Sequence, residues 1–280
     1  FVVEKKYYVT GNTAEGFVNF LEANLQGIQQ IIVISHPSNQ VKTLVLQGLI
    51  QHVKQHHEVE VICSALSRSF LDGMIVRDKQ LAVITDTIAK PNLKVTATIM
   101  IDHLFNGEKI EVGQQAVNRL KNDYDQFMQQ SYISFAKGLK IHDDLEAIYI
   151  KEMDFKKADA ISEQSIARVL KDVPKKQRKV VVYTRLFGTS TAEGPITIVP
   201  ELIQPLKKRV FVKGRAGTGK SVFMKKVAKA CKAHGLDHEI HRCSFDPNSV
   251  DMVLVPELSF CMFDSTDPHE YFPERPEDEL

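Results

Sequence analysis

The nine-residue stretch KGRAGTGKS, at positions 213–221, restricts the fold of this chain more than any other feature. Its glycines and its terminal Lys-Ser pair satisfy the spacing G-x-x-x-x-G-K-[ST]. The preceding residues, RVFV at 209–212, form a short apolar run typical of a strand. The following residues, up to Gly235, carry apolar side chains at helical spacing and end at a glycine stop signal. The sequence therefore predicts a strand, a glycine loop and a helix in direct succession.

A loop of this kind is typical of phosphate binding. Its glycines let successive backbone N–H groups point at phosphate oxygens, while Lys220 can reach the β and γ phosphates and the Ser221 hydroxyl can ligate Mg²⁺. We therefore expect ATP or another nucleoside triphosphate, with Mg²⁺, as the ligand. The alternative interpretation is a glycine turn without a ligand. The predicted nucleotide-binding residues are Gly214, Arg215, Ala216, Gly217, Thr218, Gly219, Lys220, Ser221 and Val222.

Composition argues against other classes of partner. A formal net charge of +1 gives no electrostatic basis for binding nucleic acid or an anionic membrane, and the basic cluster at 174–179 fits a solvated linker better. The apolar runs are shorter than the ~20 residues that span a bilayer, and no signal-peptide pattern opens the sequence, so we expect a soluble, cytoplasmic protein. Four cysteines without C-x-x-C spacing predict reduced thiols, and a metal site built on His241 and Cys243 is disfavoured.

An internal repeat organises the rest of the chain. The segment GNTAEG at 11–16 recurs as GTSTAEG at 188–194, with an offset of 178, and this offset lays Lys42 on Lys220 and Thr43 on Ser221. After a shift of one residue, the later parts of the two copies also align. We therefore predict a three-layer α/β P-loop NTPase fold in tandem duplication, with a helical insertion between the copies. Residues 1–178 form a P-loop-like unit that includes a helical segment at about 111–171, and residues 179–280 form the nucleotide-binding unit.

The first copy has lost the glycines of the loop. His36, Asn39 and Val41 stand where the second copy has its three glycines. Their side chains would fill the concavity that phosphate oxygens enter, and a β-branched residue resists the backbone angles that glycine permits. A structural role or a partner surface is therefore favoured for the first copy over a second nucleotide site.

A carboxylate that could hold magnesium follows the last apolar strand. The run LSFCMFD ends at Asp264, which we predict to share the metal with Ser221; the alternative is a simple turn residue at the strand end. The aligned position in the first copy is Thr85, and Asp86 is displaced by one. Because a slip of one residue turns a strand side chain to the other face, we expect Asp86 to be lost from its site.

Other residues are weaker candidates for the chemistry. Asp246 and Asp251 could contact magnesium or a second substrate, or each could cap a helix. In the proline-rich segment 267–280, His269 and Glu270 are predicted catalytic residues that position water or an acceptor, against the alternative of a solvated loop.

The sequence places no arginine firmly at the γ-phosphate. Arg215 and Arg275 are loop candidates for that charge-stabilising role.

The segment between the copies has apolar residues at helical spacing, and it predicts an antiparallel pair of helices. Structural packing is the favoured role of this pair; a lid or a protein-docking arm is the alternative. The second copy is expected to contribute about three sheet strands of its own, and to be incomplete at its C-terminal end.

These segments also resemble a known family. KGRAGTGKS, CSFDPNSVDMVLVPEL, FDSTDPHEYFPERP and the repeated TAEG look like an uncharacterised bacterial family of tandem P-loop ATPase-like proteins, over nearly the whole chain. The resemblance implies nucleotide binding but no substrate. We expect slow Mg-dependent ATP hydrolysis coupled to conformational change. The alternatives are phosphoryl transfer to a small acceptor and nucleotide sensing with negligible turnover.

Overall fold

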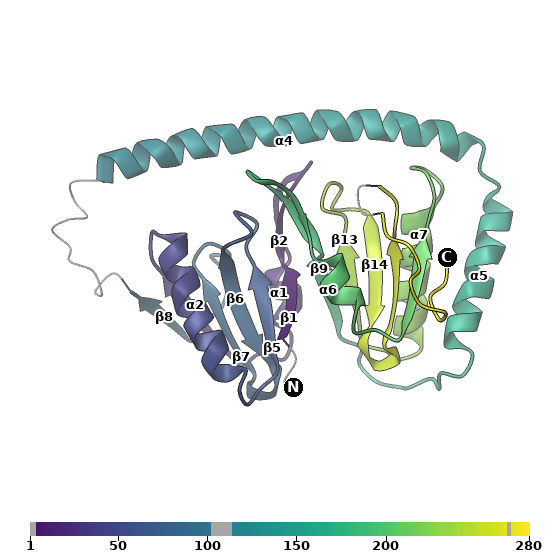
Figure 1. Cartoon of the computed structure of the whole chain (residues 1–280), viewed down its shortest axis with the longest axis horizontal. Coiled ribbons are helices and arrows are strands. Elements are labelled where there is room, and N and C mark those ends of the chain that lie inside the picture. The colour runs from purple at the N-terminus through teal and green to yellow at the C-terminus, as the bar shows by residue number, and fades with distance from the viewer. Residues whose placement is uncertain (1–3, 102–113, 268–269) are drawn as a thin grey trace. The chain divides into compact units, whose positions relative to one another are not determined.

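The computed structural model describes residues 4–101, 114–267 and 270–280. Contacts group the chain into two units, one of residues 1–135 with 188–196 (unit 1) and one of residues 136–187 with 197–280 (unit 2). This grouping differs from the boundary at 178 that the repeat predicts. Both units are α/β, which confirms the predicted fold class at that level (Figure 1).

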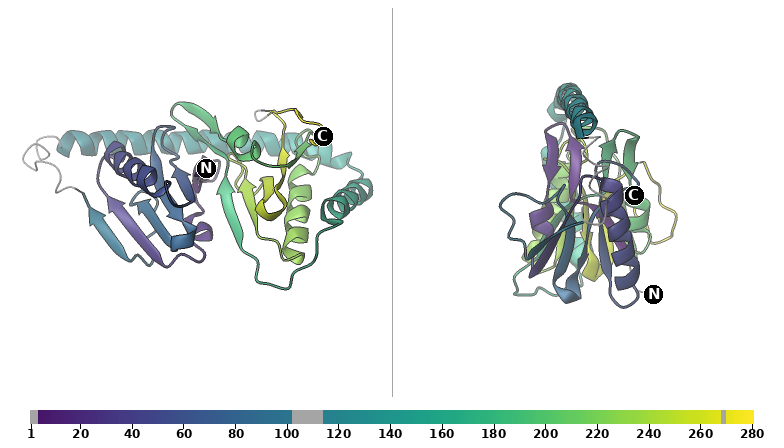
Figure 2. Two further views of the ribbon diagram at one scale, coloured as in Figure 1. Left: turned by 60° about the horizontal axis from the view of Figure 1, so that its bottom comes forward. Right: turned by 90° about the vertical axis from the view of Figure 1, so that its left-hand side faces the viewer.

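Unit 1 contains a mixed sheet covered by one long helix. Its strands lie in the order β1-β5-β6-β7-β4-β8, and the pairs β5-β6 and β6-β7 are antiparallel while the other pairs are parallel. Helix α2 (Asn39–Val53) lies over one face of these strands (Figure 2) and buries Leu46 and Ile50 against them. The strands are β1 (Glu4–Tyr8), β4 (Gln30–Ser35), β5 (Val59–Cys63), β6 (Leu71–Val76), β7 (Leu81–Thr85) and β8 (Ala97–Met100), and the short elements are α1 (Leu21–Asn24) and η1 (Arg77–Lys79).

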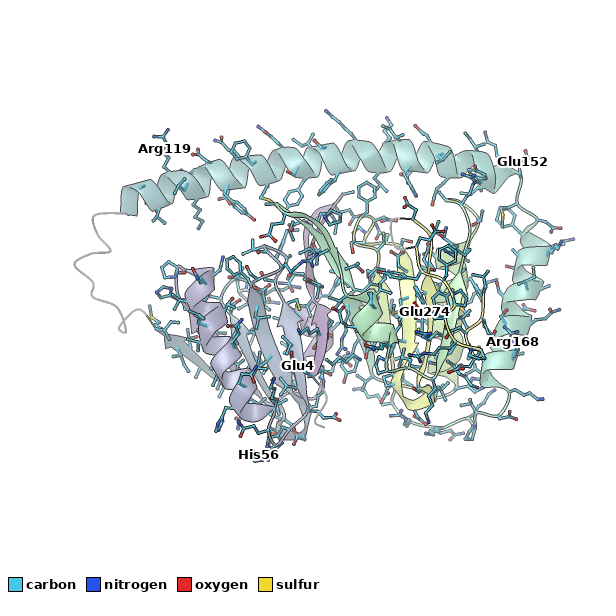
Figure 3. All side chains as sticks on the ribbon, viewed as in Figure 1. Glu4, His56, Arg119, Glu152, Arg168 and Glu274 are labelled. Atoms are coloured by element: carbon cyan, nitrogen blue, oxygen red, sulfur yellow. The ribbon has the colours of Figure 1, made fainter. Side chains whose placement is uncertain are left out.

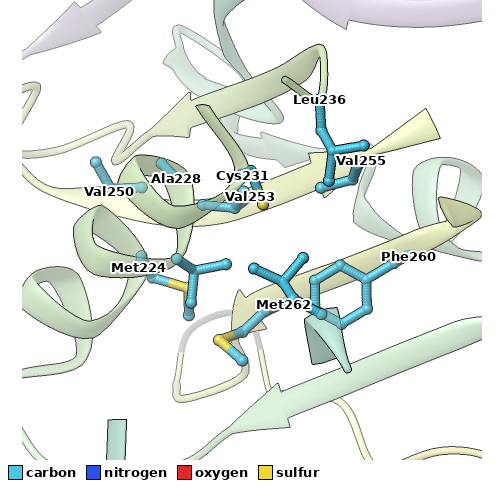
Figure 4. Packing of buried hydrophobic residues seen from close by; sticks show 11 residues of the cluster. Met224, Ala228, Cys231, Leu236, Val250, Val253, Val255, Phe260 and Met262 are labelled. Carbon is cyan, nitrogen blue, oxygen red and sulfur yellow. The ribbon is translucent and has the colours of Figure 1, made fainter. Parts of the chain in front are cut away.

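Unit 2 has the same kind of sheet, in the order β12-β15-β14-β13-β9. Helix α7 (Lys220–Ala233) packs on it, and α5 (Phe155–Leu170) packs beside α7 in the same hydrophobic core; Figure 4 shows this core around Met224 and Phe260. The strands are β9 (Val182–Leu186), β12 (Lys208–Val212), β13 (His238–Arg242), β14 (Val250–Val255) and β15 (Phe260–Asp264), and the short helices are α6 (Val199–Ile203) and η3 (Pro256–Leu258). The expectation of about three strands was wrong, because five described strands form this sheet.

The two halves of the chain follow the same succession of elements. From β1 to β7 and from β9 to β15, each strand and helix has a counterpart, and the paired strands run in the same relative directions. The turn before β7 uses Gln80 and the turn before β15 uses Ser259, and both residues have left-handed backbone angles. At the sheet edge, β8 runs parallel to β4, while Glu279 makes a single parallel bridge to Val210 of β12.

A hairpin from the second half of the chain belongs to unit 1. This hairpin is formed by β10 (Gly188–Thr191) and β11 (Gly194–Thr197), and it packs against the hairpin of β2 (Thr10–Thr13) and β3 (Gly16–Asn19). Asn12 joins them: its backbone N–H donates to Thr189 Oγ1 (3.1 Å), and its Nδ2 donates to the carbonyl of Ser190 (2.8 Å). The two TAEG repeats therefore contact each other.

The segment between the repeats differs from the predicted antiparallel pair. Helix α4 (Gln114–Lys151) runs without a break for 38 residues, and it does not pack along α5. Gly138 lies within this helix, and a Cβ added to it would lie 3.3 Å from the ring of Phe245, so the glycine leaves room for that ring. The chain turns only before α5, where the Asp154 carboxylate accepts a hydrogen bond from the N–H of Lys157 (3.0 Å). Among the described residues, no helix is both long and apolar enough to cross a membrane.

Candidate functional site

The glycine loop connects β12 to α7, as its sequence predicts. Gly217 (φ 76°) and Gly219 (φ 86°) have left-handed backbone angles, and Gly219 is the N-cap residue of α7. Residues with a Cβ adopt such angles at a cost, so the two glycines explain the local path of the loop. The loop thus presents the N-terminus of a 14-residue helix, where backbone N–H groups and the helix dipole favour an anion.

Lys220 lies at the centre of this site. Its Nζ donates to the carbonyls of Gly214 (2.6 Å) and Arg215 (3.0 Å), and it is 3.5 Å from Oδ2 of Asp264. Asp264 reaches this position because β15 is the parallel neighbour of β12, with Val212 paired to Asp264. The motif lysine and the predicted metal carboxylate are therefore brought together at the carboxyl end of the two strands.

A second carboxylate lies beside Asp264. Met252 of β14 pairs with Phe263 of the antiparallel strand β15, so Asp251 and Asp264 are the next opposed pair. The pKa of Asp251 is raised to about 7, chiefly by burial and also by the nearby Asp264, against a hydrogen bond with Cys243 that lowers it. Asp251 lies within a strand, so the alternative that it caps a helix was wrong.

The Ser221 hydroxyl also points to the start of β14. Its oxygen accepts a hydrogen bond from the N–H of Val250 (3.0 Å). Together, Ser221, Asp251 and Asp264 offer hydroxyl and carboxylate oxygens, which are the ligand types that Mg²⁺ prefers. The residues present fit a magnesium ion, and Ser221 and Asp264 remain the predicted ligands.

Glu270 lies next to the beginning of the loop. Its Oε1 accepts a hydrogen bond from Nζ of Lys213 (2.9 Å), and the same ammonium stands 3.9 Å from the centre of the Phe272 ring. His269, the other predicted catalytic residue of this segment, lies outside the described residues. Of these two residues, Glu270 is the one that the structure describes beside the loop.

The other candidates have different surroundings. Arg275 donates to the carbonyls of Gln204 and Leu206, which precede β12, so it lies at the opposite end of that strand and is a wrong candidate for the γ-phosphate. Arg215 is exposed on the loop, as is Val222 on the first turn of α7. Asp246 accepts a hydrogen bond from the N–H of Asn248 (3.0 Å) and shapes a turn.

The sequence did not identify one acidic residue at the loop. Glu146 of α4 accepts a hydrogen bond through Oε1 from the N–H of Gly217 (3.3 Å). The contact is close, because a Cβ added to Gly217 would lie 2.5 Å from the carbonyl oxygen of Glu146. The Glu146 carboxylate thus accepts a hydrogen bond from an N–H group that is predicted to donate to phosphate. No motif marks Glu146, since it lies far from the loop in the sequence.

The corresponding place in unit 1 has a different loop. Here α2 begins at Asn39, capped by Ser38, whose side chain accepts from the N–H of Val41 (3.4 Å). The positions aligned with Gly217 and Gly219 are therefore already helical, and His36 Nδ1 accepts from the N–H of Ser38 (2.9 Å). The described loop contains no glycine and is closed by its own side chains.

Unit 1 nevertheless keeps the pairing of lysine with a carboxylate. Lys42 Nζ lies 2.6 Å from Oδ1 of Asp86 and 2.8 Å from Oγ1 of Thr87. The prediction that Asp86 would be lost from this place was wrong, because β7 ends at Thr85 and strand alternation no longer determines the direction of the next side chain. Lys42 is buried and ion-paired within unit 1.

Two further contacts recur in unit 1. The Thr43 hydroxyl accepts from the N–H of Leu71 (3.0 Å), as Ser221 does from Val250. Burial also raises the pKa of Asp72, the counterpart of Asp251, to about 7, against a hydrogen bond from Ser64. The two units thus share a set of interactions around the lysine, and differ in the glycine loop itself.

Comparisons with family models, with curated proteins and with solved structures found no match for this chain.

Proposed function

We propose that unit 2 binds a magnesium complex of ATP or another nucleoside triphosphate at its glycine loop and hydrolyses it slowly. One observation carries this proposal: Lys220 and Asp264 meet at a glycine loop that opens a helix. A helix N-terminus with a lysine attracts phosphate, and a carboxylate beside it suits the accompanying cation. Ser221 and Asp264 would hold the magnesium ion, which would neutralise charge that develops on the phosphates.

The position of Glu146 supports a coupling between nucleotide binding and α4. A triphosphate in the loop would compete with the Glu146 carboxylate for the N–H of Gly217, and like charges would repel. Binding is therefore expected to move this part of α4 away from the loop. The same contact favours nucleotide sensing as the second candidate function, because such a response needs little turnover.

The recurring elements support a tandem duplication in which only the second copy keeps the phosphate loop. In the first copy Lys42 is engaged by Asp86 and Thr87, and the glycine positions are helical. The resemblance to tandem P-loop ATPase-like proteins and the three-layer arrangement belong to this same proposal. One nucleotide per chain is the expected stoichiometry.

Paired lysine variants test the proposal. Lys220→Ala should weaken Mg-ATP binding at least tenfold, about 1.4 kcal/mol, because a charge-assisted contact to phosphate is lost. Lys42→Ala is the matched control and should leave the affinity nearly unchanged. Isothermal titration calorimetry measures both variants, and circular dichroism checks that they are folded. Equal affinities of wild type and Lys220→Ala, or a stoichiometry of two, would contradict the assignment.

Phosphate release separates hydrolysis from sensing. Wild-type protein with saturating Mg-ATP should release phosphate slowly and without an added acceptor. Binding without detectable release would favour sensing, and release that requires a small hydroxyl compound would favour phosphoryl transfer.

A further inference from the structure

A threonine that follows Asp264 shares a hydrogen-bond acceptor with Lys220. The acceptor is the carbonyl oxygen of Gly214, at the start of the glycine loop. Nζ of Lys220 donates to it at 2.6 Å, and Oγ1 of Thr266 donates to it at 3.1 Å. All these residues belong to unit 2, and Thr266 lies at the start of the C-terminal segment in which Figure 3 labels Glu274. The carbonyl therefore has one charged donor and one neutral donor.

The same threonine also orients the carboxylate that is proposed to hold magnesium. Its backbone N–H donates to Oδ1 of Asp264 (3.0 Å), and Oδ2 of that carboxylate lies 3.5 Å from Nζ of Lys220. Thr266 thus contacts Asp264 through its backbone and the glycine loop through its side chain. It connects the carboxyl ends of β15 and β12 at the site.

The ammonium group of Lys220 has too few donors to keep all its contacts and also bind a triphosphate. An ammonium has three N–H donors. In the structure its neighbours are the carbonyls of Gly214 and Arg215 and the carboxylate of Asp264. Contacts to a β and a γ phosphate would take two of the three donors. At least one of the two loop carbonyls would then lose the lysine.

Each of these carbonyls has a threonine hydroxyl as a further donor. Oγ1 of Thr218 donates to the carbonyl of Arg215 (2.7 Å), and Oγ1 of Thr266 donates to that of Gly214. A carbonyl that keeps a donor when the lysine leaves avoids the cost of an unpaired polar group. The two hydroxyls therefore make it easier for the lysine to move to phosphate.

We propose that Thr266 is a positioning residue of the nucleotide site, whose hydroxyl keeps the Gly214 carbonyl paired when Lys220 moves to the phosphates. This inference rests on the proposed function, because it concerns how the same loop accepts a triphosphate. In the free protein Lys220 pairs the carbonyl, so the hydroxyl contributes little there. In the nucleotide complex the hydroxyl remains as its donor. Thr266 thus favours the bound state over the free state.

Nucleotide affinity is the first test. Thr266→Val keeps the shape of the side chain and removes the hydroxyl. In isothermal titration calorimetry, Mg-ATP affinity should fall about fivefold, because the half-buried carbonyl would lack both donors in the complex. Thr266→Ser keeps the hydroxyl and should bind as the wild type does. Thr87→Val is the matched control in unit 1, where Thr87 aligns with Thr266 and accepts from Nζ of Lys42 (2.8 Å), and it should leave the affinity unchanged.

The second test needs no nucleotide. In urea denaturation of the free protein, Thr266→Val should lower the unfolding midpoint only slightly, because Lys220 still pairs the carbonyl. In a Lys220→Ala background the same change should lower the midpoint further, because the carbonyl then loses both donors. Thr266→Ser in that background should show no such additional loss. Circular dichroism follows the unfolding and checks that each variant is folded.

These outcomes separate the inference from the proposed function. Equal affinities of wild type and Thr266→Val, or a loss of affinity that Thr266→Ser shares, overturn the inference. An equal change of midpoint in both backgrounds overturns it too. A wild type that binds no Mg-ATP refutes the proposed function, and the inference with it, whereas the other outcomes refute the inference alone.

Discussion

Replacing Glu146 by glutamine should strengthen nucleotide binding. The change keeps the length and shape of the side chain and removes its charge. In the structure, Glu146 occupies the N–H of Gly217 through one hydrogen bond of 3.3 Å, and it presents a negative charge where the triphosphate is proposed to bind. A nucleotide would no longer have to displace a carboxylate from this donor.

The expected size of the effect follows from the geometry. Hydrogen bonds to charged groups contribute roughly 1.5–3 kcal/mol. The Glu146 side chain is 36 % exposed, so solvent screening reduces this to about 1 kcal/mol. The repulsion between the carboxylate and the phosphates adds a term of similar size at most. These terms together amount to about 1 to 2 kcal/mol, so we expect Mg-ATP affinity to rise between about fivefold and thirtyfold.

Calorimetry of three proteins measures this prediction. Wild type and Glu146→Gln are compared with Glu152→Gln, a matched control that removes a carboxylate just beyond the end of α4. The control should bind as wild type does. Unchanged or weaker binding by Glu146→Gln would refute the idea that this carboxylate competes with phosphate. If wild type binds no nucleotide at all, the proposed function fails instead, so the two failures can be told apart.

Three further outcomes are expected. Asp264→Asn should slow phosphate release by about two orders of magnitude but change Mg-ATP affinity only a few-fold, because this carboxylate acts through the metal. Steady-state assays of phosphate release measure this change. Glu270→Gln should also lower turnover without loosening ATP; equal turnover would remove it from the chemistry. The pKa of Asp72 is raised from an ordinary value of 3.8 to about 7 in the folded state. Between pH 3.8 and pH 7 the folded state therefore keeps a proton on Asp72 that the unfolded state loses, so the free energy of unfolding falls as the pH rises towards 7. Asp72→Asn should flatten this fall in urea denaturation series between pH 4 and 8; parallel curves would contradict the shift.

The local structure of the phosphate loop was predictable because the motif itself contains the residues that determine it. Gly217 and Gly219 have the backbone angles that glycine supplies, and the apolar runs on both sides become β12 and α7. The repeat offset of 178 at β12 and 179 at β13 also matches the one-residue shift seen in the sequence. The loop structure depends on neighbouring residues alone, and the repeat offset can be read from the sequence because both copies contain the same elements.

Features that depend on distant contacts were not predictable. β9 contains the buried Arg185, which lies 3.0 Å from Glu239 of β13, and a charged residue in a strand gives no sign of such a partner. Glu146 reaches the glycine loop because α4 packs near that loop, although α4 ends at Lys151, far before the loop in the sequence.

The hairpin of β10 and β11 has a consequence for biosynthesis. Unit 1 consists mostly of the first 135 residues, yet the backbone N–H and the Nδ2 group of Asn12 donate hydrogen bonds to Thr189 and Ser190. Domains generally fold as units while the chain is made from its N-terminus. The packing of the β2–β3 hairpin against the β10–β11 hairpin can therefore form only after about residue 196 has emerged from the ribosome. A chain that ends before this hairpin would lack these two hydrogen bonds of Asn12.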